Sequence, residues 1–304
     1  MKILVTGGCG YKGSVLVPKL QKAGHNVKVY DTQWFGKDER WAVQDIREMQ
    51  ELESFDAIIH LASVANDPSA NLAPGLTWEV TAHGTQHLMD LAARAGVKHF
   101  IYASSASVYG VKEEERVTED LTCVPVSVYN RSKLVAERIC LSYADQMAVT
   151  ILRPATVCGL SPRMRLDVVV NMLTMQALTR GKITVLGGTQ TRPNIHIEDI
   201  TNLYCWLLDR PEITGVFNAG NENLAVSEIA EIIAEKTGAK IDIKPSDDPR
   251  SYRLCSDKLA TAGWGPQHTV NDAVAEITEA ARSFELVEDD SMSNVNWMRR
   301  EGIV

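Results

Sequence analysis

The segment TGGCGYKG, residues 6–13, carries three glycines at the spacing GxxGxxG directly after the apolar run KILV. A helical run, KGSVLVPKLQKAG, begins at Lys12. Gly7 permits a tight turn, Gly10 lets the backbone approach a pyrophosphate, and Gly13 lets the helix pack against the strand. The amino end of such a helix also attracts an anion. The strand, the turn and the helix together predict a dinucleotide-binding α/β fold.

An acidic residue, Asp31, ends the second apolar run, NVKVY, about 20 residues after the glycines. A carboxylate in this position accepts hydrogen bonds from both ribose hydroxyls of an adenosine. A 2′-phosphate about 5 Å away is disfavoured by roughly 3 kcal/mol per unit charge at an effective dielectric constant of about 20. Thr32 and Gln33 follow, not an arginine. NAD is therefore predicted rather than NADP, and a glycine turn without a ligand is the alternative.

Two weaker predictions concern the same end of the chain. Asp45 and Ile46 are expected to end a short third strand and flank the adenine, unless they belong to a plain loop. Lys12 stands where an apolar residue would pack under the turn. We expect its side chain to extend to solvent rather than to contact a phosphate.

Strand-like and helix-like runs alternate over the first half of the chain. Near-continuous apolar strands separated by amphipathic helices predict a parallel sheet covered on both faces. The further strands are FDAIIHLAS, VKHFIYASS and AVTILRP, and the further helices are TWEVTAHGTQHLMDLAARAG and VYNRSKLVAERICLSYADQ. After Arg153 the pattern is less regular, with helices MRLDVVVNMLTMQALTRG and LAVSEIAEIIAEKTG and short strands KITVLGG, GVFNAG and KIDIKP.

The predicted fold class is α/β, a Rossmann doubly wound parallel sheet with a smaller α+β C-terminal substrate lobe. The expected boundaries are 1–155 for the NAD-binding domain with a returning segment about 190–218, 156–189 and 219–285 for the substrate-binding lobe, and 286–304 for a C-terminal tail. The tail is polar and acidic and carries one tryptophan, so it either docks on the body or frays.

The composition excludes several classes of partner. The 304 residues include 31 Lys and Arg, which are scattered, and the net charge is −8. Nucleic acids and anionic membranes require a basic face, so neither is predicted. No apolar run approaches the ~20 residues needed to cross a bilayer. Because Met1 leads directly into the strand KILVT, we expect no signal peptide.

The cysteines and histidines point to no metal. The six cysteines never form CxxC, which favours small buried hydrophobes in a reducing compartment and hence a cytoplasmic location. His83 and His87 are four residues apart on a predicted helix, as zinc ligands can be. There is no glutamate in an HExxH pattern and no evident third ligand, so a helix-surface pair is the better interpretation.

A serine strand end and the pentapeptide YNRSK, residues 129–133, supply a candidate catalytic set. On a helix, Tyr129 and Lys133 lie on one face about one turn apart. A free phenol has a pKa near 10, so its use as a base at pH 7 costs about 4 kcal/mol. A nearby ammonium and a positive nicotinamide both favour the phenolate. Tyr129 is predicted as the base, Lys133 as its electrostatic partner and ribose anchor, and Ser105 as the hydrogen-bonding aid; ordinary helix surface is the alternative.

These motifs resemble the extended short-chain dehydrogenases/reductases, in the branch of nucleotide-sugar epimerases and dehydratases typified by UDP-galactose 4-epimerase. The resemblance covers residues 1 to about 285 and rests on TGGCGYKG, Asp31, DI at 45–46, HLAS at 60–63, SSASVYG at 104–110, YNRSK, LRPATVCG and RPNIHIEDI. It implies a nucleoside diphosphate sugar in the smaller lobe and a homodimer built from helices of the first domain. The cofactor contacts that it implies are Gly7, Gly10, Tyr11, Gly13, Asp31, Asp45, Ile46, Leu61, Ala62, Ser63, Ala103, Tyr129, Lys133 and Pro154.

The chain departs from this family's pattern in ways that bear on the reaction. Dehydratases of the family carry an Asp-Glu pair after the catalytic Ser or Thr, whereas Ala106 and Ser107 follow Ser105 here. A 4,6-dehydratase is therefore disfavoured. Thr81 and Thr156 replace two asparagines usual in the family, which puts a close match to galactose epimerases in doubt.

Several arginines are candidates for holding the substrate phosphates, because a guanidinium pairs bidentately with phosphate oxygens. For each of them a surface charge is the alternative. The predicted substrate contacts are Ser105, Ala106, Thr156, Arg163, Arg165, Arg192 and Arg253, with Arg250 a lesser alternative to Arg253.

The predicted function is an NAD-dependent epimerase acting on a nucleoside diphosphate sugar by transient hydride transfer at a carbinol. The alternative is a sugar-nucleotide dehydrogenase or ketoreductase with exchangeable NAD(H). A non-catalytic NAD-sensing regulator is disfavoured because it has no use for the Ser105, Tyr129 and Lys133 set. The apolar stripes Val80/Leu88/Leu91 and Leu134/Ile139 suit either a dimer bundle or core packing.

Overall fold

A parallel six-stranded sheet is the centre of the molecule in the computed structural model, which describes residues 1–35, 37–246 and 251–303. Every neighbouring pair of strands in this sheet is parallel, as predicted. The strand order is β2 (Asn26–Tyr30), β1 (Lys2–Thr6), β3 (Ala57–His60), β4 (His99–Ala103), β5 (Ala148–Pro154) and β9 (Gly215–Ala219).

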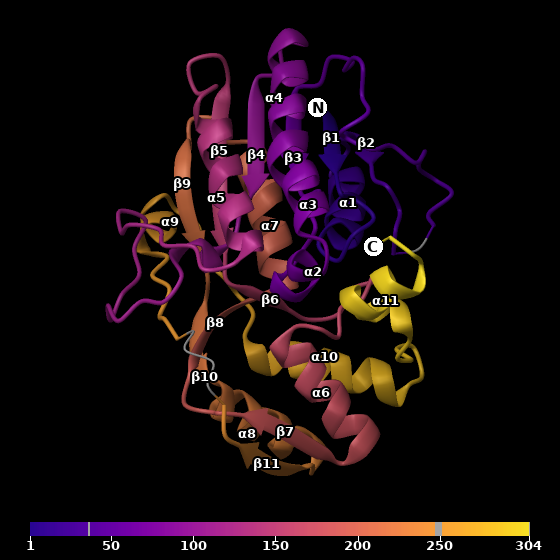
Figure 1. Cartoon of the computed structure of the whole chain (residues 1–304), viewed down its shortest axis with the longest axis vertical. Helices are drawn as coiled ribbons and strands as arrows, with labels where there is room; N and C mark the ends of the chain where they lie inside the picture. Colours follow the sequence, from indigo (N-terminus) through magenta and orange to yellow (C-terminus); the bar gives the residue numbers. More distant parts are fainter. Residues whose placement is uncertain (36, 247–250, 304) are drawn as a thin grey trace.

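Helices cover both faces of the sheet because successive side chains of each strand point to opposite faces. From β1, Ile3 and Val5 pack towards α1 (Gly13–Lys22) and α7 (Ile197–Leu208), while Leu4 packs towards the other face. That other face is covered by α4 (Gly84–Arg94) and α5 (Val128–Leu141). Figure 1 shows α4 and α5 on one side of the sheet and α1 and α7 on the other.

The order in which strands are added to this sheet changes direction at β1, the second strand from one edge. From β1 the chain proceeds outward to β2 and then returns to β3 on the opposite side of β1. Ligands of open α/β sheets bind beyond the carboxyl ends of the strands at such a switch point. This topology places the glycine turn after β1, the end of β2 and the segment after β3 around one crevice.

A second group of elements lies beyond the carboxyl ends of the strands (Figure 1). It has a three-stranded sheet in the order β10 (Glu222–Ala225), β8 (Thr191–His196), β6 (Thr156–Cys158) and a two-stranded sheet of β11 (Lys240–Lys244) and β7 (Lys182–Leu186). Its helices α6 (Val169–Arg180), α8 (Val226–Thr237) and α10 (Val270–Arg282) share one apolar core. The returning segment predicted about 190–218 divides between the two groups, since β8 pairs with β6 and β10 whereas α7 packs on α1.

Two local predictions were wrong. The short third strand expected to end at Asp45 is only an isolated bridge between Asp31 and Val43, because the surrounding loop adds no further ladder hydrogen bonds. The single helix expected after Leu76 is interrupted by a π-helical segment, η1 (Glu79–His83), between α3 (Pro74–Trp78) and α4. The remaining elements are α2 (Asp67–Leu72), η2 (Ala106–Tyr109), α9 (Asp257–Thr261), η3 (Asp290–Met292) and α11 (Asn294–Arg300).

The C-terminal tail docks on the body. Met298 of α11 is buried in an apolar cluster with Val64, Ala73 and Val80. Of the two expectations for this segment, docking is therefore the one that its described residues satisfy.

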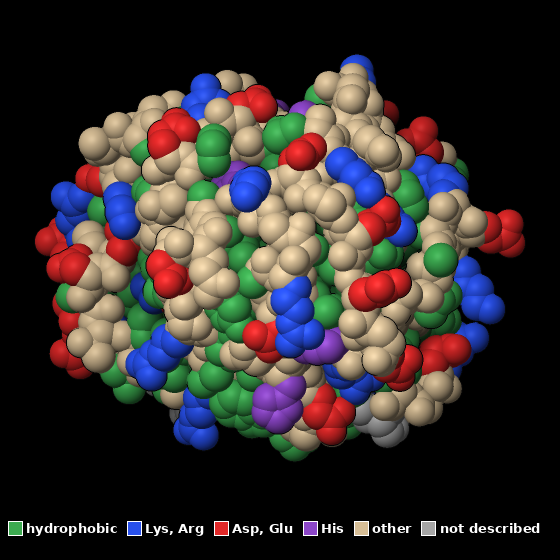
Figure 2. All heavy atoms as spheres, turned by 90° about the horizontal axis from the view of Figure 1, so that it is seen from above, with side chains coloured by type: hydrophobic (Ala, Val, Ile, Leu, Met, Phe, Trp, Pro, Cys, Tyr) green, Lys and Arg blue, Asp and Glu red, His purple; other side chains and the backbone are tan. Residues whose placement is uncertain are grey.

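The surface carries both signs of charge. On the face drawn in Figure 2, lysine and arginine side chains alternate with aspartate and glutamate, without an extended area of either sign. Among the described residues, no helix is both long and apolar enough to span a bilayer.

Candidate active site

A cavity of about 510 Å³ lies at the carboxyl ends of the sheet strands. Most of the side chains predicted for the cofactor and the substrate line it. They are Gly7, Gly10, Tyr11, Gly13, Asp31, Asp45, Ile46, Leu61, Ala62, Ser63, Ser105, Tyr129, Lys133, Pro154, Thr156, Arg163, Arg165 and Arg192. The structure thus brings together residues that lie up to 185 positions apart in the chain.

The glycine turn has no room for larger side chains. Gly7 has φ +72°, and a Cβ atom there would lie 2.6 Å from the backbone nitrogen of Ala62. A Cβ on Gly13 would lie 2.5 Å from the Cα of Gly8. The side chain of the N-cap residue, Lys12, makes no capping hydrogen bond to the amino end of α1. This close backbone turn fits a pyrophosphate, because its N–H groups are the natural partners of phosphate oxygens.

Asp31 is held in a fixed orientation at the other side of this turn. Its Oδ2 accepts a hydrogen bond from the Cys9 amide at 2.9 Å, and its Oδ1 accepts one from the Gln33 amide at 2.7 Å. Burial raises the pKa of the carboxyl, while these amides and the charge of Arg163 oppose the rise. Each oxygen keeps a second lone pair for a ribose hydroxyl. Asp45 lines the cavity too, but its carboxylate is engaged by Arg47 at 2.7 Å.

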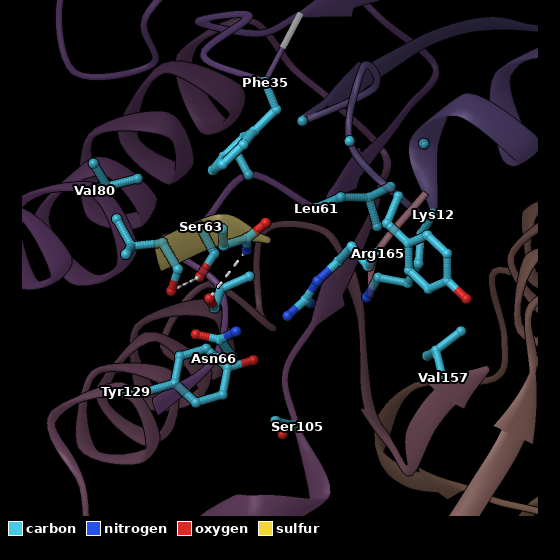
Figure 3. A pocket seen from close by; sticks show the side chains of 18 of the residues that line it. Lys12, Phe35, Leu61, Ser63, Asn66, Val80, Ser105, Tyr129, Val157 and Arg165 are labelled. Atoms are coloured by element: carbon cyan, nitrogen blue, oxygen red, sulfur yellow. Dashed lines mark hydrogen bonds between the residues drawn. The ribbon is translucent and has the colours of Figure 1, made fainter. Parts of the chain in front are cut away.

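The predicted catalytic side chains meet at the inner end of the cavity. Figure 3 shows Ser105 and Tyr129 pointing into it from the turn after β4 and from the start of α5. The hydroxyl of Ser105 lies 2.7 Å from that of Ser107, which donates to Oδ1 of Asn130 at 2.5 Å. Ser107 and Asn130 thereby orient Ser105. Neither was predicted, although both stand next to predicted residues.

Lys133 is buried below Tyr129. Its Nζ donates a hydrogen bond to the carbonyl oxygen of Ala103 at 2.7 Å and lies 6.0 Å from the centre of the Tyr129 ring. Burial, followed by the charge of Lys12, lowers the pKa of Lys133 to about 7. Ala103 itself does not line the cavity, because its side chain packs in the core. Ala103 adjoins the cavity through the hydrogen bond that its carbonyl accepts from Lys133, and its contact with the cofactor stays a prediction.

The phenol of Tyr129 is not acidic in the chain alone. Burial raises its pKa to about 12, and a hydrogen bond with Ser105 and the charge of Arg165 only partly oppose this rise. At neutral pH the isolated chain therefore holds a phenol, and a further positive charge next to the ring is needed to favour the phenolate.

The four predicted arginines have different surroundings. Arg165 donates from Nε to Asp167 at 2.7 Å, while its buried Nη2 has no hydrogen-bond partner among the described residues. Figure 3 shows Arg165 directed into the cavity on the side that faces Tyr129. Arg192 lines the same cavity from β8.

Arg163 lies at the opposite end from the predicted sugar site. Its guanidinium stacks on the ring of Phe35, 4.2 Å from the ring centre, and donates a hydrogen bond to Oδ1 of Asn294 at 2.6 Å. These two contacts hold Arg163 towards the end of the cavity that contains Asp31. Arg163 therefore lies at the end of the cavity that holds Asp31, and its contact with substrate phosphates stays a prediction.

Two predicted substrate contacts lie outside the cavity. Arg253 lines a separate cavity of about 590 Å³ together with Glu115 and Arg116. Its neighbour in the chain, Tyr252, lines the main cavity instead. Ala106 is 1% exposed because the η2 turn directs it into the core. The alternative Arg250 lies outside the described residues.

Lys12 is the main surprise of the site. It lines the cavity instead of extending to bulk solvent, with Nζ 5.8 Å from the centre of the Tyr204 ring. Burial and the charge of Arg165 lower its pKa to about 8. The prediction failed because only the packing of α7 against α1 shows that the space under the turn opens into the cavity. Asn294 and Met298 of the tail also line it and carried no sequence signal.

Comparison with known proteins agrees with this geometry. The profile of the NAD dependent epimerase/dehydratase family matches residues 3–220. The chain is 29% identical to the UDP-glucose 4-epimerase of Lactobacillus helveticus, over 90% of this chain and 95% of that one. It is 32% identical to UDP-glucuronic acid decarboxylase 1 of Danio rerio, over 87% of this chain and 69% of that one.

A solved structure is similar throughout. It is the UDP-glucuronic acid 4-epimerase from Bacillus cereus in complex with UDP-glucuronic acid and NAD. The TM-score is 0.81 at 27% identity, and the alignment covers 93% of this chain and all of that one.

Proposed function

The chain belongs to the NAD dependent epimerase/dehydratase family, and from this premise we propose that it epimerises a nucleoside diphosphate sugar with NAD as cofactor. It is an NAD-dependent enzyme of the extended short-chain dehydrogenase/reductase class. The observation that carries the proposal is one cavity with two ends. The glycine turn and Asp31 line one end, and Ser105, Tyr129 and Lys133 line the other.

The chain's own residues provide binding and proton transfer. When bound, NAD supplies an acceptor that takes a hydride from the sugar carbinol and returns it. The glycine turn would hold the pyrophosphate and Asp31 the adenosine ribose. Ser105, oriented by Ser107, would hold the carbinol oxygen. Tyr129 would accept the hydroxyl proton and return it, and Lys133 would hold the second ribose.

Loss of water is disfavoured by the structure of the turn after β4. A dehydratase needs an acid and a base beside the sugar, whereas Ala106 is buried in the core. Ser107 is engaged with Asn130 and Ser105. Neither position supplies a titratable group, so hydride and proton transfer at one carbinol is the chemistry that these residues can perform.

We further propose that the nucleotide is UDP, because the relatives and the similar solved structure carry UDP sugars in their names. Nη2 of Arg165, which has no hydrogen-bond partner among the described residues, lies on the side of Tyr129 and favours a sugar with an acceptor group there. The test is conversion of UDP-glucose and UDP-glucuronic acid by the purified chain, followed by chromatography of the sugar products.

Two measurements separate an epimerase from the alternative dehydrogenase. Denaturation of the purified chain should release about one NAD per chain, and no absorbance should accumulate at 340 nm during turnover. Tyr129→Phe should reduce turnover by about 10²- to 10⁴-fold, which is the usual contribution of a positioned acid or base. Steady growth of absorbance at 340 nm would favour the dehydrogenase, and undiminished turnover by Tyr129→Phe would refute the catalytic assignment.

We propose a homodimer in the cytoplasm. Leu134 and Ile139, one of the stripes considered for a dimer bundle, pack against the chain's own core. On the same helix Val135 and Leu141 are exposed and available to a partner. All six cysteines are free thiols, which suits a reducing compartment. Light scattering during gel filtration tests the dimer, and Val135→Glu should shift it to a monomer.

A further inference from the structure

Two side chains of the C-terminal segment 286–303 line the cofactor end of the cavity. Asn294 and Met298, both in α11, line the cavity and are 3% and 1% exposed. They lie beyond residue 220, where the match to the family ends. Figure 1 shows α11 near the C-terminus, beside α2 and beyond the carboxyl ends of the strands.

The segment is attached at three separate places. The Leu166 amide donates to the carbonyl of Met292 at 2.8 Å. The Asn294 amide donates to Oδ2 of Asp167 at 3.2 Å, and Arg163 donates to the Asn294 side chain at 2.6 Å. The indole of Trp297 donates to the carbonyl of Trp34. These contacts join the tail to both groups of elements around the cavity.

The attachments converge on the end that holds Asp31. Arg163 bridges Asn294 and the ring of Phe35, and its charge acts on the Asp31 carboxylate. Met298 packs against Val64 and Val80 with Phe35 at the edge of the same apolar cluster. An apolar wall beside a ribose-binding carboxylate suits an adenine base, which is flat and largely apolar on its faces.

We infer that segment 286–303 completes the dinucleotide site, with Asn294 and Met298 walling the adenosine end, so that α11 must undock before the cofactor can leave. The inference rests on the proposed NAD site but not on epimerisation. Retention of the cofactor through many turnovers is what an enzyme needs when it regenerates its cofactor within each cycle.

Trp297 is the informative position, because it docks α11 without lining the cavity. The experiment loads the full chain with NADH and follows loss of its fluorescence during a chase with excess NAD. Trp297→Ala and Asn294→Ala should each speed release at least about tenfold, equivalent to about 1.4 kcal/mol. Asn296→Ala, an exposed residue of the same helix, should change release by less than twofold and is the matched control.

Binding linkage provides a second measurement that does not depend on the substitutions. Because coupling between two events is reciprocal, saturating NAD should slow tryptic cleavage at the exposed Arg299 and Arg300 of the unaltered chain. Equal release from the unaltered chain and Trp297→Ala, with no protection of the tail, would overturn the inference while leaving the NAD site intact. Tighter binding by Trp297→Ala would overturn it as well, because α11 would then compete with adenosine. A chain that binds no dinucleotide would overturn the proposed function too.

Discussion

Replacing Asp31 by asparagine should change which dinucleotide the chain prefers. The substitution keeps the size of the side chain and one oxygen that can accept the Cys9 or the Gln33 amide. It removes the negative charge that faces the ribose. Arg163, whose charge acts on this carboxylate, remains in place.

The magnitude follows from two terms. Hydrogen bonds to a charged acceptor contribute about 1.5–3 kcal/mol each, so loss of one such bond should weaken NAD binding about 10- to 100-fold. Removal of a charge about 5 Å from a 2′-phosphate relieves roughly 3 kcal/mol per unit charge, which strengthens NADP binding about 100-fold. The ratio of the two dissociation constants should therefore move by about a thousandfold or more towards NADP.

The assay is titration of the cofactor-free chain with NADH and with NADPH, followed by fluorescence at constant ionic strength. Asp56→Asn is the matched control, since Asp56 caps the Lys2 amide at the opposite end of the sheet. A change in the ratio below about threefold for Asp31→Asn, with thermal stability preserved, would refute the placement of the adenosine ribose at this carboxylate.

Three further predictions, one of them with a control substitution, test other parts of the molecule. Lys12→Met should stabilise the cofactor-free chain. Folding lowers the pKa of Lys12 from 10.5 to about 8, so the unfolded chain binds more protons than the folded chain between these two pH values. The free-energy cost of burying the ammonium is therefore fully present below about pH 8 and falls as the pH rises. The gain in Tm should be largest at pH 7 and vanish near pH 10.5, and a gain that grows with pH would contradict this. Gly7→Ala should abolish retention of NAD, because its Cβ would lie 2.6 Å from Ala62, whereas Gly24→Ala, with φ +84° and open space around it, should lower stability by only about 1–2 kcal/mol and leave NAD content unchanged. Glu137→Ala should lower the free energy of unfolding by about 3–5 kcal/mol, because the buried guanidinium of Arg153 loses the carboxylate with which it pairs at 2.7 Å. Urea unfolding measures this change, and a loss below about 1 kcal/mol would exclude a structural role for the pair.

The regular part of the fold was predictable because short stretches of neighbouring residues determine its strands and helices. The strands of the main sheet are four to seven residues long and are mostly apolar runs, with β2 alternating between buried and exposed side chains, and the covering helices have an apolar face and often a glycine at the end. The prediction of a third strand ending at Asp45 was wrong because a strand needs successive hydrogen bonds to a neighbouring strand, and the loop after β2 forms only one bridge, at Val43. Likewise, η1 is a tertiary adjustment within a sequence that has helical periodicity throughout.

The structure brings to one cavity those predicted site residues that stand at strand ends and helix starts. Asp31, Ser105 and Tyr129 occupy such positions, and parallel strands bring them to one edge regardless of the details of packing. The structure places Arg253 in a separate cavity and Arg163 beside Asn294, and these places depend on how irregular segments lie over the main cavity. For such side chains, sequence supplies the charge but not the direction.

The order of the elements, the glycine turn, the choice of NAD and the convergence of Ser105, Tyr129 and Lys133 were determined by the sequence itself, because each depends on local spacing and on the fixed geometry of a parallel sheet. Tertiary structure alone decided that Lys12 faces the cavity, that Arg163 stacks on Phe35, and that Asn294 and Met298 of α11 line the cavity. Those outcomes arise from contacts between segments more than a hundred residues apart, where burial and desolvation, rather than local pattern, determine where a side chain lies.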